Sequence, residues 1–287
     1  MQIILNADDF GRSSSINSAV KQAFQNGLLT SASLMVTGEA FYEAVVMARQ
    51  IPDLAVGLHI VLIQGRPVLP PGDIPAIVED DGTFMRNPAR VWLNFLFNAT
   101  ARQQAVREMQ AQFDRYAETG LPLTHVDGHL HLHMHPSIFR PLLPLAVQYR
   151  AKGLRLPRDN AWFSLKFDHQ RIFEKTLWAI VFRILNRSSY QRIQTQSLKV
   201  TQQVYGLMES GHMSEDYLLK LLGEIDIPSA ELYFHPDTAH QMEPLGPNPG
   251  DLAALLSPAV RRLIEERGIQ RVNYATLNDH RGNGHVS

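Results

Sequence analysis

Short apolar segments alternate along the whole chain with longer stretches of helical periodicity, and this alternation is the feature that most constrains the fold. Eight segments predict strands: Ile3–Asn6, Ser33–Val36, Ala55–Leu62, Leu123–Val126, Leu154–Leu156, Gln203–Tyr205, Leu232–Phe234 and Arg271–Ala275. The intervening patterns predict helices: Ile16–Asn26, Ala40–Gln50, Ala101–Glu118, Ser137–Ala151, Ser214–Leu222 and Pro258–Arg267. Such alternation favours a parallel α/β sheet or barrel. About eight strands in 287 residues favour one barrel-like domain over two domains.

Two segments depart from this alternation. Residues Gln64–Arg90 are rich in proline and glycine and predict a long loop, whereas Ala161–Lys199 predicts a helical insertion in which basic and large apolar residues are interleaved. The insertion is either a helix pair packed on the barrel or a basic, aromatic-rich amphipathic lid that contacts a membrane surface. We assign residues 1–280 to one domain and residues 281–287 to a flexible tail.

Composition narrows the class of protein. The formal net charge of -1 gives no indication of a nucleic-acid partner. The absence of cysteine excludes disulfides and thiolate metal sites. The N-terminus lacks a signal-peptide pattern, and no apolar stretch reaches the roughly 18 residues of a membrane span. We therefore expect a soluble, cytoplasmic protein.

The first chemical signal is the pair Asp8-Asp9, directly after the first predicted strand. Active sites of α/β barrels are built at the carboxyl ends of strands. Because the chain turns there, one acid can bind a cation while its neighbour faces the substrate. The alternative interpretation is a turn that contains a helix-capping acid.

The second signal is a run of histidines, five of the twelve in the chain, at positions 125, 129, 131, 133 and 135. In an extended chain the odd positions share one face, which would carry these five imidazoles and the carboxylate of Asp127. A protein core rarely tolerates such a face unless the groups are hydrogen-bonded or bind a metal. A solvated strand edge is the alternative.

Two single histidines, each outside the histidine run, are further candidate functional residues. His59 lies inside an apolar strand two residues after Gly57, which indicates close backbone approach, and His235 ends a late strand just before a proline. Each alone is more typical of a core histidine than of a ligand. One carboxylate and two imidazoles together would leave coordination positions open for water and substrate, as catalytic metal sites do. The spare histidines leave a two-metal phosphoesterase open, and a non-catalytic sugar-binding protein is a further alternative.

These motifs resemble one known family. Asn-Ala-Asp-Asp-Phe-Gly at 6–11, Gly-Leu-His at 57–59, Thr-His-Val-Asp-Gly-His-Leu-His-Leu-His at 124–133 and His-Pro at 235–236 resemble the YdjC-like carbohydrate deacetylases. The resemblance implies a distorted (β/α) barrel that removes acetyl groups from N-acetylated sugars with one divalent ion, Mg²⁺ or Zn²⁺. It also suggests a homodimer.

Site roles follow from the same resemblance, position by position. Asp9, His59 and His129 look like the metal ligands, Asp8 like the catalytic base and His235 like the acid. The side chains expected to support the ligands are His125, Asp127, His131 and His133; no role is assigned to His135.

Further stretches resemble the hopanoid-biosynthesis-associated branch of that family. They are Ser-Leu-Met-Val at 33–36, the stretch 57–67, Gly-His-Met at 211–213 and the stretch 231–236. This likeness implies an N-acetylglucosaminyl hopanoid as substrate, and a protein peripheral to the inner membrane.

Overall fold

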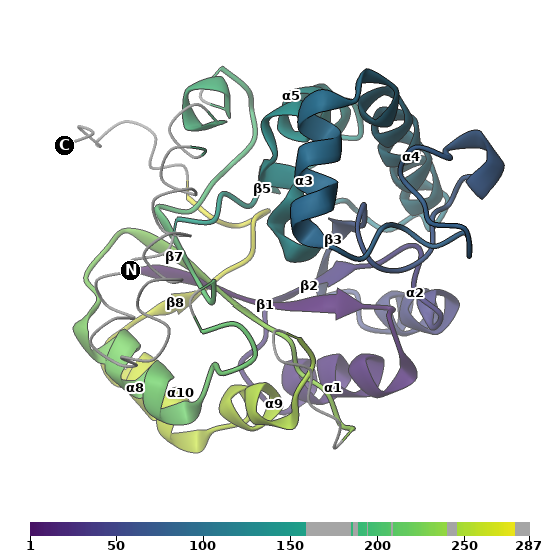
Figure 1. Ribbon diagram of the computed structural model, residues 1–287. Helices are drawn as coiled ribbons and strands as arrows, with labels where there is room; N and C mark the ends of the chain where they lie inside the picture. The colour runs from purple at the N-terminus through teal and green to yellow at the C-terminus, as the bar shows by residue number, and fades with distance from the viewer. Residues whose placement is uncertain (159–184, 186–188, 194, 208, 240–245, 279–287) are drawn as a thin grey trace.

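A single curled sheet organises the computed structural model, which describes residues 1–158, 185, 189–193, 195–207, 209–239 and 246–278 (Figure 1). Its strands are β1 (Gln2–Phe10), β2 (Ser31–Leu34), β3 (Ala55–Ile60), β4 (His125–Gly128), β5 (Gly153–Leu154), β6 (Gln203–Tyr205), β7 (Ser229–Phe234) and β8 (Gln270–Arg271). All the pairings are parallel, in the order β5-β4-β3-β2-β1-β7-β6, and β8 pairs with the first residues of β1. The predicted distorted (β/α) barrel is therefore confirmed. All eight predicted strands are present; β6 has its predicted bounds, and the others differ at one or both ends.

Helices connect the strands and cover the outside of the sheet (Figure 1). They are α1 (Ser14–Gln25), α2 (Phe41–Gln50), α3 (Pro88–Phe97), α4 (Ala99–Ala117), α5 (Pro136–Gln148), α8 (Glu215–Glu224), α9 (Pro249–Leu255) and α10 (Pro258–Glu266). Short 3-10 turns lie at η1 (Pro71–Asp73) and η2 (His129–Met134). The sequence did not predict α3 or α9. Apolar residues lie on both the buried and the exposed sides of α3, so it lacks the one-sided pattern by which helices are recognised.

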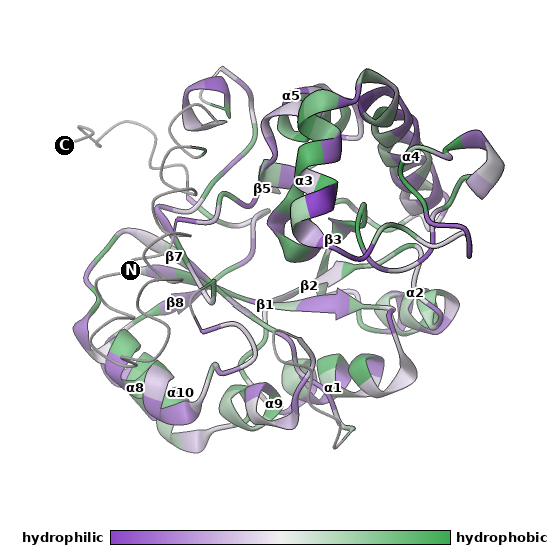
Figure 2. Cartoon of the chain, viewed as in Figure 1, coloured by the Kyte–Doolittle hydropathy of each residue, from purple (hydrophilic) through white to green (hydrophobic). Residues whose placement is uncertain are grey.

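The polar motifs lie at one end of a sheet whose strands are otherwise buried. Every residue of β1, β3, β4 and β7 is buried, as expected for a parallel sheet with both faces covered. Within this core the end of β1 is coloured as hydrophilic (Figure 2). Since all the strands run in parallel, the polar residues at their carboxyl ends meet at one edge of the sheet.

The histidine run is not extended along its whole length, so the condition for one shared face is not met. β4 ends at Gly128, and the chain then turns through η2, where Leu130 and His131 have left-handed φ angles of 49° and 53°. Gly128 has no Cβ, and one placed there would lie 3.0 Å from the ring of His133. The histidines therefore point in several directions instead of sharing one face.

The long loop after β3 is held by one helix. Residues 61–85 are mostly irregular, as predicted, although the last predicted loop residues begin α3. Three buried side chains of α4, spaced four residues apart, bind the loop backbone: Gln104 accepts from the N–H of residue 76, Glu108 from those of residues 68 and 69, and Gln112 from that of residue 61. These bonds satisfy buried backbone groups that the loop cannot pair itself.

Most of the predicted insertion at 161–199, and all of the predicted tail at 281–287, lie outside the described residues. Within the part of the chain that the structure describes, no helix has the length and apolarity to cross a membrane.

Candidate metal centre

β1 ends in two adjacent carboxylates whose side chains have different neighbours. The pairing register with β2 shifts near this end of the strand, and Asp9 has a left-handed backbone with a φ angle of 62°. Such a conformation costs on the order of 1–3 kcal/mol in a residue other than glycine and persists only where other contacts hold it. As a result, Asp8 contacts Arg155, while Asp9 contacts His59 and His129.

The three residues that the sequence predicts as metal ligands come together. Asp9 Oδ1 lies 3.4 Å from His59 Nε2 and 3.2 Å from His129 Nδ1, and the three ligand atoms all lie within 4.8 Å of one another. Two ligands bound about 2.1 Å from one zinc ion at the tetrahedral angle would be about 3.4 Å apart. The observed spacing therefore suits a single divalent ion.

Hydrogen bonding at His59 also fits a metal ligand. Its Nε2 is buried and has no hydrogen-bond partner among the described residues, although a lone buried ring nitrogen is costly. Its Nδ1 lies 2.7 Å from Asp127 Oδ1. Metal-binding histidines are commonly held in this way, with the second nitrogen bonded to a carboxylate that fixes the tautomer and the ring orientation.

Electrostatics favour cation binding at the same place. Burial would raise the pKa of Asp9, but the charges of His129, His59 and His235 hold it well below its ordinary value. Burial would lower the pKa of His59, yet Asp127 raises it to about 9. A metal ion bound at Nε2 would therefore replace a proton that the site already attracts.

The buried carboxylate of Asp127, on β4, contacts side chains from neighbouring parts of the sheet. Its Oδ1 accepts from His59, and its Oδ2 accepts from Ser33 Oγ at 2.7 Å and lies 2.9 Å from Arg155 Nη2. Burial would raise the pKa of Asp127, but Arg155 and His59 hold it well below its usual range. Because the Ser33 hydroxyl gives its one proton to Asp127, the Nε2 of His125, 2.9 Å away, donates to Ser33.

Three buried residues of this network were missed from the sequence: Arg155, Glu231 and Tyr274. Arg155 follows β5 and contacts Asp8, Asp127 and Glu231. The Tyr274 hydroxyl donates to Glu231 Oε2 at 2.6 Å, and burial raises the pKa of Glu231. A charged residue inside a predicted buried strand, as in Leu-Arg-Leu at 154–156, is the signal that could have indicated Arg155.

Of the remaining histidines in the run, three surround the cluster. The ring of His125 packs directly on Gly57, where a Cβ would lie 2.4 Å from the ring. His131 Nε2 lies 2.9 Å from the Tyr233 hydroxyl, and His133 Nε2 lies 3.1 Å from the Arg155 carbonyl oxygen. Burial lowers the pKa values of His125 and His133 to about 4, so both are neutral supports and not charged groups.

His135 lies apart from the cluster, in agreement with its having no predicted role. Its Nδ1 accepts from the Ser137 N–H at 3.2 Å and caps α5, and its ring packs 4.4 Å from that of Trp92. Burial lowers its pKa to about 4.

His235, the predicted acid, lies at the rim of the same site. It follows β7, which pairs with β1 and so brings it beside the Asp8-Asp9 turn. Its backbone N–H donates to Asp251 Oδ2 at 2.8 Å. Its Nδ1 is buried without a hydrogen-bond partner among the described residues, so no other described side chain occupies this nitrogen.

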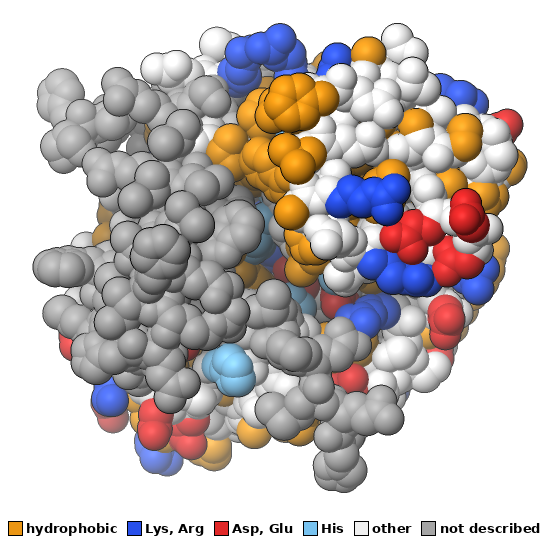
Figure 3. All heavy atoms as spheres, in the orientation of Figure 1, with side chains coloured by type: hydrophobic (Ala, Val, Ile, Leu, Met, Phe, Trp, Pro, Cys, Tyr) orange, Lys and Arg blue, Asp and Glu red, His pale blue; other side chains and the backbone are white. Residues whose placement is uncertain are grey.

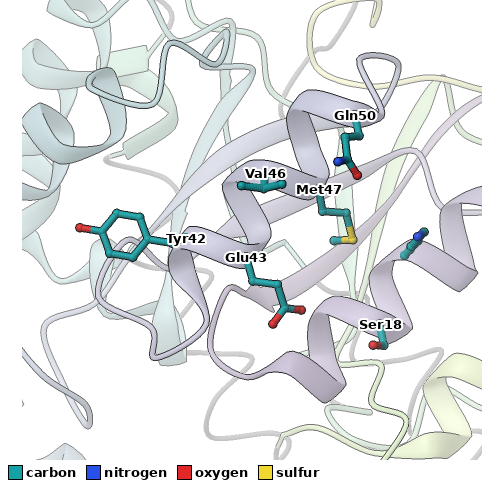
Figure 4. A pocket seen from close by; sticks show the side chains of 7 residues that line it. Ser18, Tyr42, Glu43, Val46, Met47 and Gln50 are labelled. Carbon is teal, nitrogen blue, oxygen red and sulfur yellow. The ribbon is translucent and has the colours of Figure 1, made fainter.

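A separate groove of about 480 Å³ lies between α1 and α2 (Figure 4). Its lining includes Lys21, Tyr42 and Glu43, and none of its lining residues belongs to the cluster around Asp9. The groove therefore plays no part in the site described above.

Known proteins resemble the chain along most of its length. Residues 2–266 match the family described as YdjC-like protein. A carbohydrate deacetylase of Brevibacillus brevis is 41% identical over 150 residues, which are 52% of this chain and 57% of that protein. A chitooligosaccharide deacetylase of Serratia marcescens is 36% identical over 160 residues, 55% of this chain and 60% of that protein. These matches thus span less than two thirds of either relative.

Two further similar proteins match longer parts of this chain. A chitooligosaccharide deacetylase of Salmonella heidelberg is 34% identical over 206 residues, 66% of this chain and 76% of that protein. A solved structure from Enterococcus faecalis, whose name refers to cellobiose-phosphate cleavage, covers 96% of this chain and 98% of its own with a TM-score of 0.75. At 24% sequence identity, that likeness bears on the fold alone.

Proposed function

The chain belongs to the YdjC-like family, and we propose that it is a metal-dependent deacetylase that hydrolyses the N-acetyl group of an N-acetylglucosamine-containing substrate. The observation that carries the metal dependence is the buried Nε2 of His59, which has no hydrogen-bond partner among the described residues and lies beside Asp9 and His129. The deacetylase names of the similar proteins support the choice of reaction.

In this proposal Asp9, His59 and His129 hold one divalent ion, which when bound polarises the acetyl carbonyl and acidifies water. Asp8 accepts the proton of the water that attacks the carbonyl carbon. His235 then gives a proton to the sugar nitrogen as the C–N bond breaks, so that acetate and a free amine leave. No serine or cysteine nucleophile is required. Asp127 and Ser33 keep the ring of His59 in place throughout.

The direct test is incubation of the purified protein with N,N′-diacetylchitobiose and with an N-acetylglucosaminyl lipid, followed by mass spectrometry for loss of acetyl. We expect deacetylation that stops on chelation and returns with Zn²⁺ or Mg²⁺. Asp8→Asn should keep the ion and lose about 10²–10⁴-fold in turnover, the usual contribution of general acid–base catalysis. Full activity of Asp8→Asn would exclude Asp8 as the base.

We further propose that the sugar is carried by a hopanoid and that the protein acts at the inner membrane, where residues 161–199 would contact lipid. The sequence resemblance supports this substrate, and so does an exposed apolar stripe on α3. Leu93, Leu96 and Phe97 are 56%, 49% and 77% exposed, and Leu130, next to His129, is 38% exposed. Figure 3 shows apolar side chains gathered beside a hollow in which a histidine is visible. A homodimer remains our expectation.

A comparison of two substrates tests the lipid. Replacing Leu96 and Phe97 by serine should lower kcat/KM for the N-acetylglucosaminyl lipid and leave deacetylation of N,N′-diacetylchitobiose unchanged. Tyr42→Ser, which removes an aromatic ring that is 73% exposed on α2, is the matched control. Equal kcat/KM values of the wild type and the double variant on the lipid would refute a lipid-binding role for α3.

A further inference from the structure

The guanidinium of Arg155 is fully buried and surrounded by carboxylates from three strands. Its Nη1 donates to Asp8 Oδ2 and its Nη2 to Asp8 Oδ1, each at 2.7 Å. Nη2 also lies 2.9 Å from Asp127 Oδ2, and Nε donates to Glu231 Oε1 at 3.0 Å. One side chain thus binds both Asp8 and the carboxylate that orients His59.

The hydrogen bonds of Asp8 leave only part of its carboxylate open. Oδ1 accepts from Arg155 Nη2 and also from Asn6 Nδ2 at 2.8 Å, whereas Oδ2 accepts, among the residues that the structure describes, from Arg155 Nη1 alone. Each carboxylate oxygen has about two acceptor positions. Oδ1 is therefore saturated, and Oδ2 keeps one free position that can receive a proton.

We propose, building on the deacetylase function above, that Arg155 is a positioning residue that directs Oδ2 of Asp8 toward the attacking water. A guanidinium stays protonated in proteins and cannot itself accept the proton. Its planar fork holds both oxygens of a carboxylate at once, which a lysine ammonium cannot do. The position of the fork is in turn fixed, because the guanidinium carbon lies 4.6 Å from the ring centroid of Tyr233.

The competing interpretation is that Arg155 only balances the charge of three buried carboxylates. A double-mutant cycle on kcat separates the two, because coupled residues give non-additive losses. We expect Arg155→Lys, which keeps the charge and loses the fork, to lower kcat about 100-fold with little change in KM, as a small misplacement of a reacting group does. In an Asp8→Asn background the same change should have little further effect.

Equal fold losses in both backgrounds would overturn the positioning role. Glu108→Gln changes a buried carboxylate that binds backbone N–H groups outside this network, and should leave kcat near that of the wild type. Thermal unfolding and ion content of each variant show whether it is folded. If Arg155→Lys does not fold, Asp8→Glu decides instead: it keeps a carboxylate but moves it off the fork, so near-normal kcat would refute the proposal.

Loss of the deacetylase function and loss of the Arg155 role would give different results. A wild-type protein that deacetylates none of the substrates overturns both the deacetylase function and the role of Arg155. An active wild type whose Arg155 and Asp8 losses are additive overturns only the role of Arg155.

Discussion

Replacing Asp127 with asparagine tests whether a buried carboxylate prepares His59 for the metal. The substitution changes one oxygen to an NH₂ group and removes the charge. If the remaining oxygen still accepts from His59 Nδ1, the new NH₂ group must face Arg155 Nη2, which lies 2.9 Å from Oδ2. Two donors would then oppose each other in a buried site, so the Asn side chain has no orientation that satisfies both neighbours.

The expected loss is in metal affinity. Partners that orient a metal-binding histidine typically contribute 10–100-fold in affinity, which is about 1.4–2.7 kcal/mol. The short 2.7 Å contact and the full burial of both groups place Asp127 toward the upper end of that range. Asp127 also raises the pKa of His59, and that effect should disappear in the variant.

The assay is competition between the apo-protein and a chromophoric chelator for Zn²⁺, with the ion content of each sample measured in parallel. Glu108→Gln is a matched control, because Glu108 is an equally buried carboxylate that binds backbone N–H groups away from the cluster. We expect the control to lose stability and keep its Zn²⁺ affinity. A folded Asp127→Asn protein that binds Zn²⁺ as tightly as the wild type would refute the reasoning.

Further predictions concern packing, pH and the insertion. Gly57→Ala should cost about 1–3 kcal/mol in the free energy of unfolding, since the new Cβ meets the neighbouring imidazole at 2.4 Å; Gly223→Ala, in open space on α8, should be neutral or stabilising. The low pKa of His135, about 4 against 6.5, means that only the unfolded chain takes up a proton between these pH values. The free energy of unfolding should therefore fall as pH drops through this window. His135→Gln should reduce the pH dependence of that free energy, measured in denaturant titrations, by up to about 1.4 kcal/mol per pH unit. Finally, if residues 161–199 contact membranes, the protein should sediment with anionic liposomes, and changing apolar residues there to serine should abolish this binding. Equal, negligible binding by the wild type and the variant would favour helices that pack on the barrel without contacting lipid.

Local sequence patterns predicted the strands because a parallel core makes them continuously apolar. β1 and β7 stand out through the apolar runs Ile3–Leu5 and Leu232–Phe234. β8 differs: both its residues are exposed and it pairs only with the first residues of β1, so its predicted bounds were displaced. Gly57 was read correctly as a point of close approach, although the ring that fills the space comes from β4.

The histidine run shows where a periodic pattern misleads. In an extended chain the alternation would place the histidines on one face, but two consecutive left-handed residues after His129 form a turn that no local propensity favours. Arg155 shows the complementary limit. Its partners Asp8 and Glu231 are 147 and 76 residues away, so only the assembled sheet reveals that the arginine joins them.

The arginine also bears on how many ions the site holds. Asp8, His59 and Asp127 form a second group whose ligand atoms lie within 4.8 Å of one another, and a second ion there is what a two-metal phosphoesterase would require. Arg155 already contacts both carboxylates of that second group at 2.7–2.9 Å. A second cation would have to displace a guanidinium that is fully buried, or bind beside its positive charge. We therefore expect one divalent ion per chain, measured by metal analysis of the protein after dialysis against excess Zn²⁺. Two tightly bound ions per chain would refute this and favour the phosphoesterase alternative.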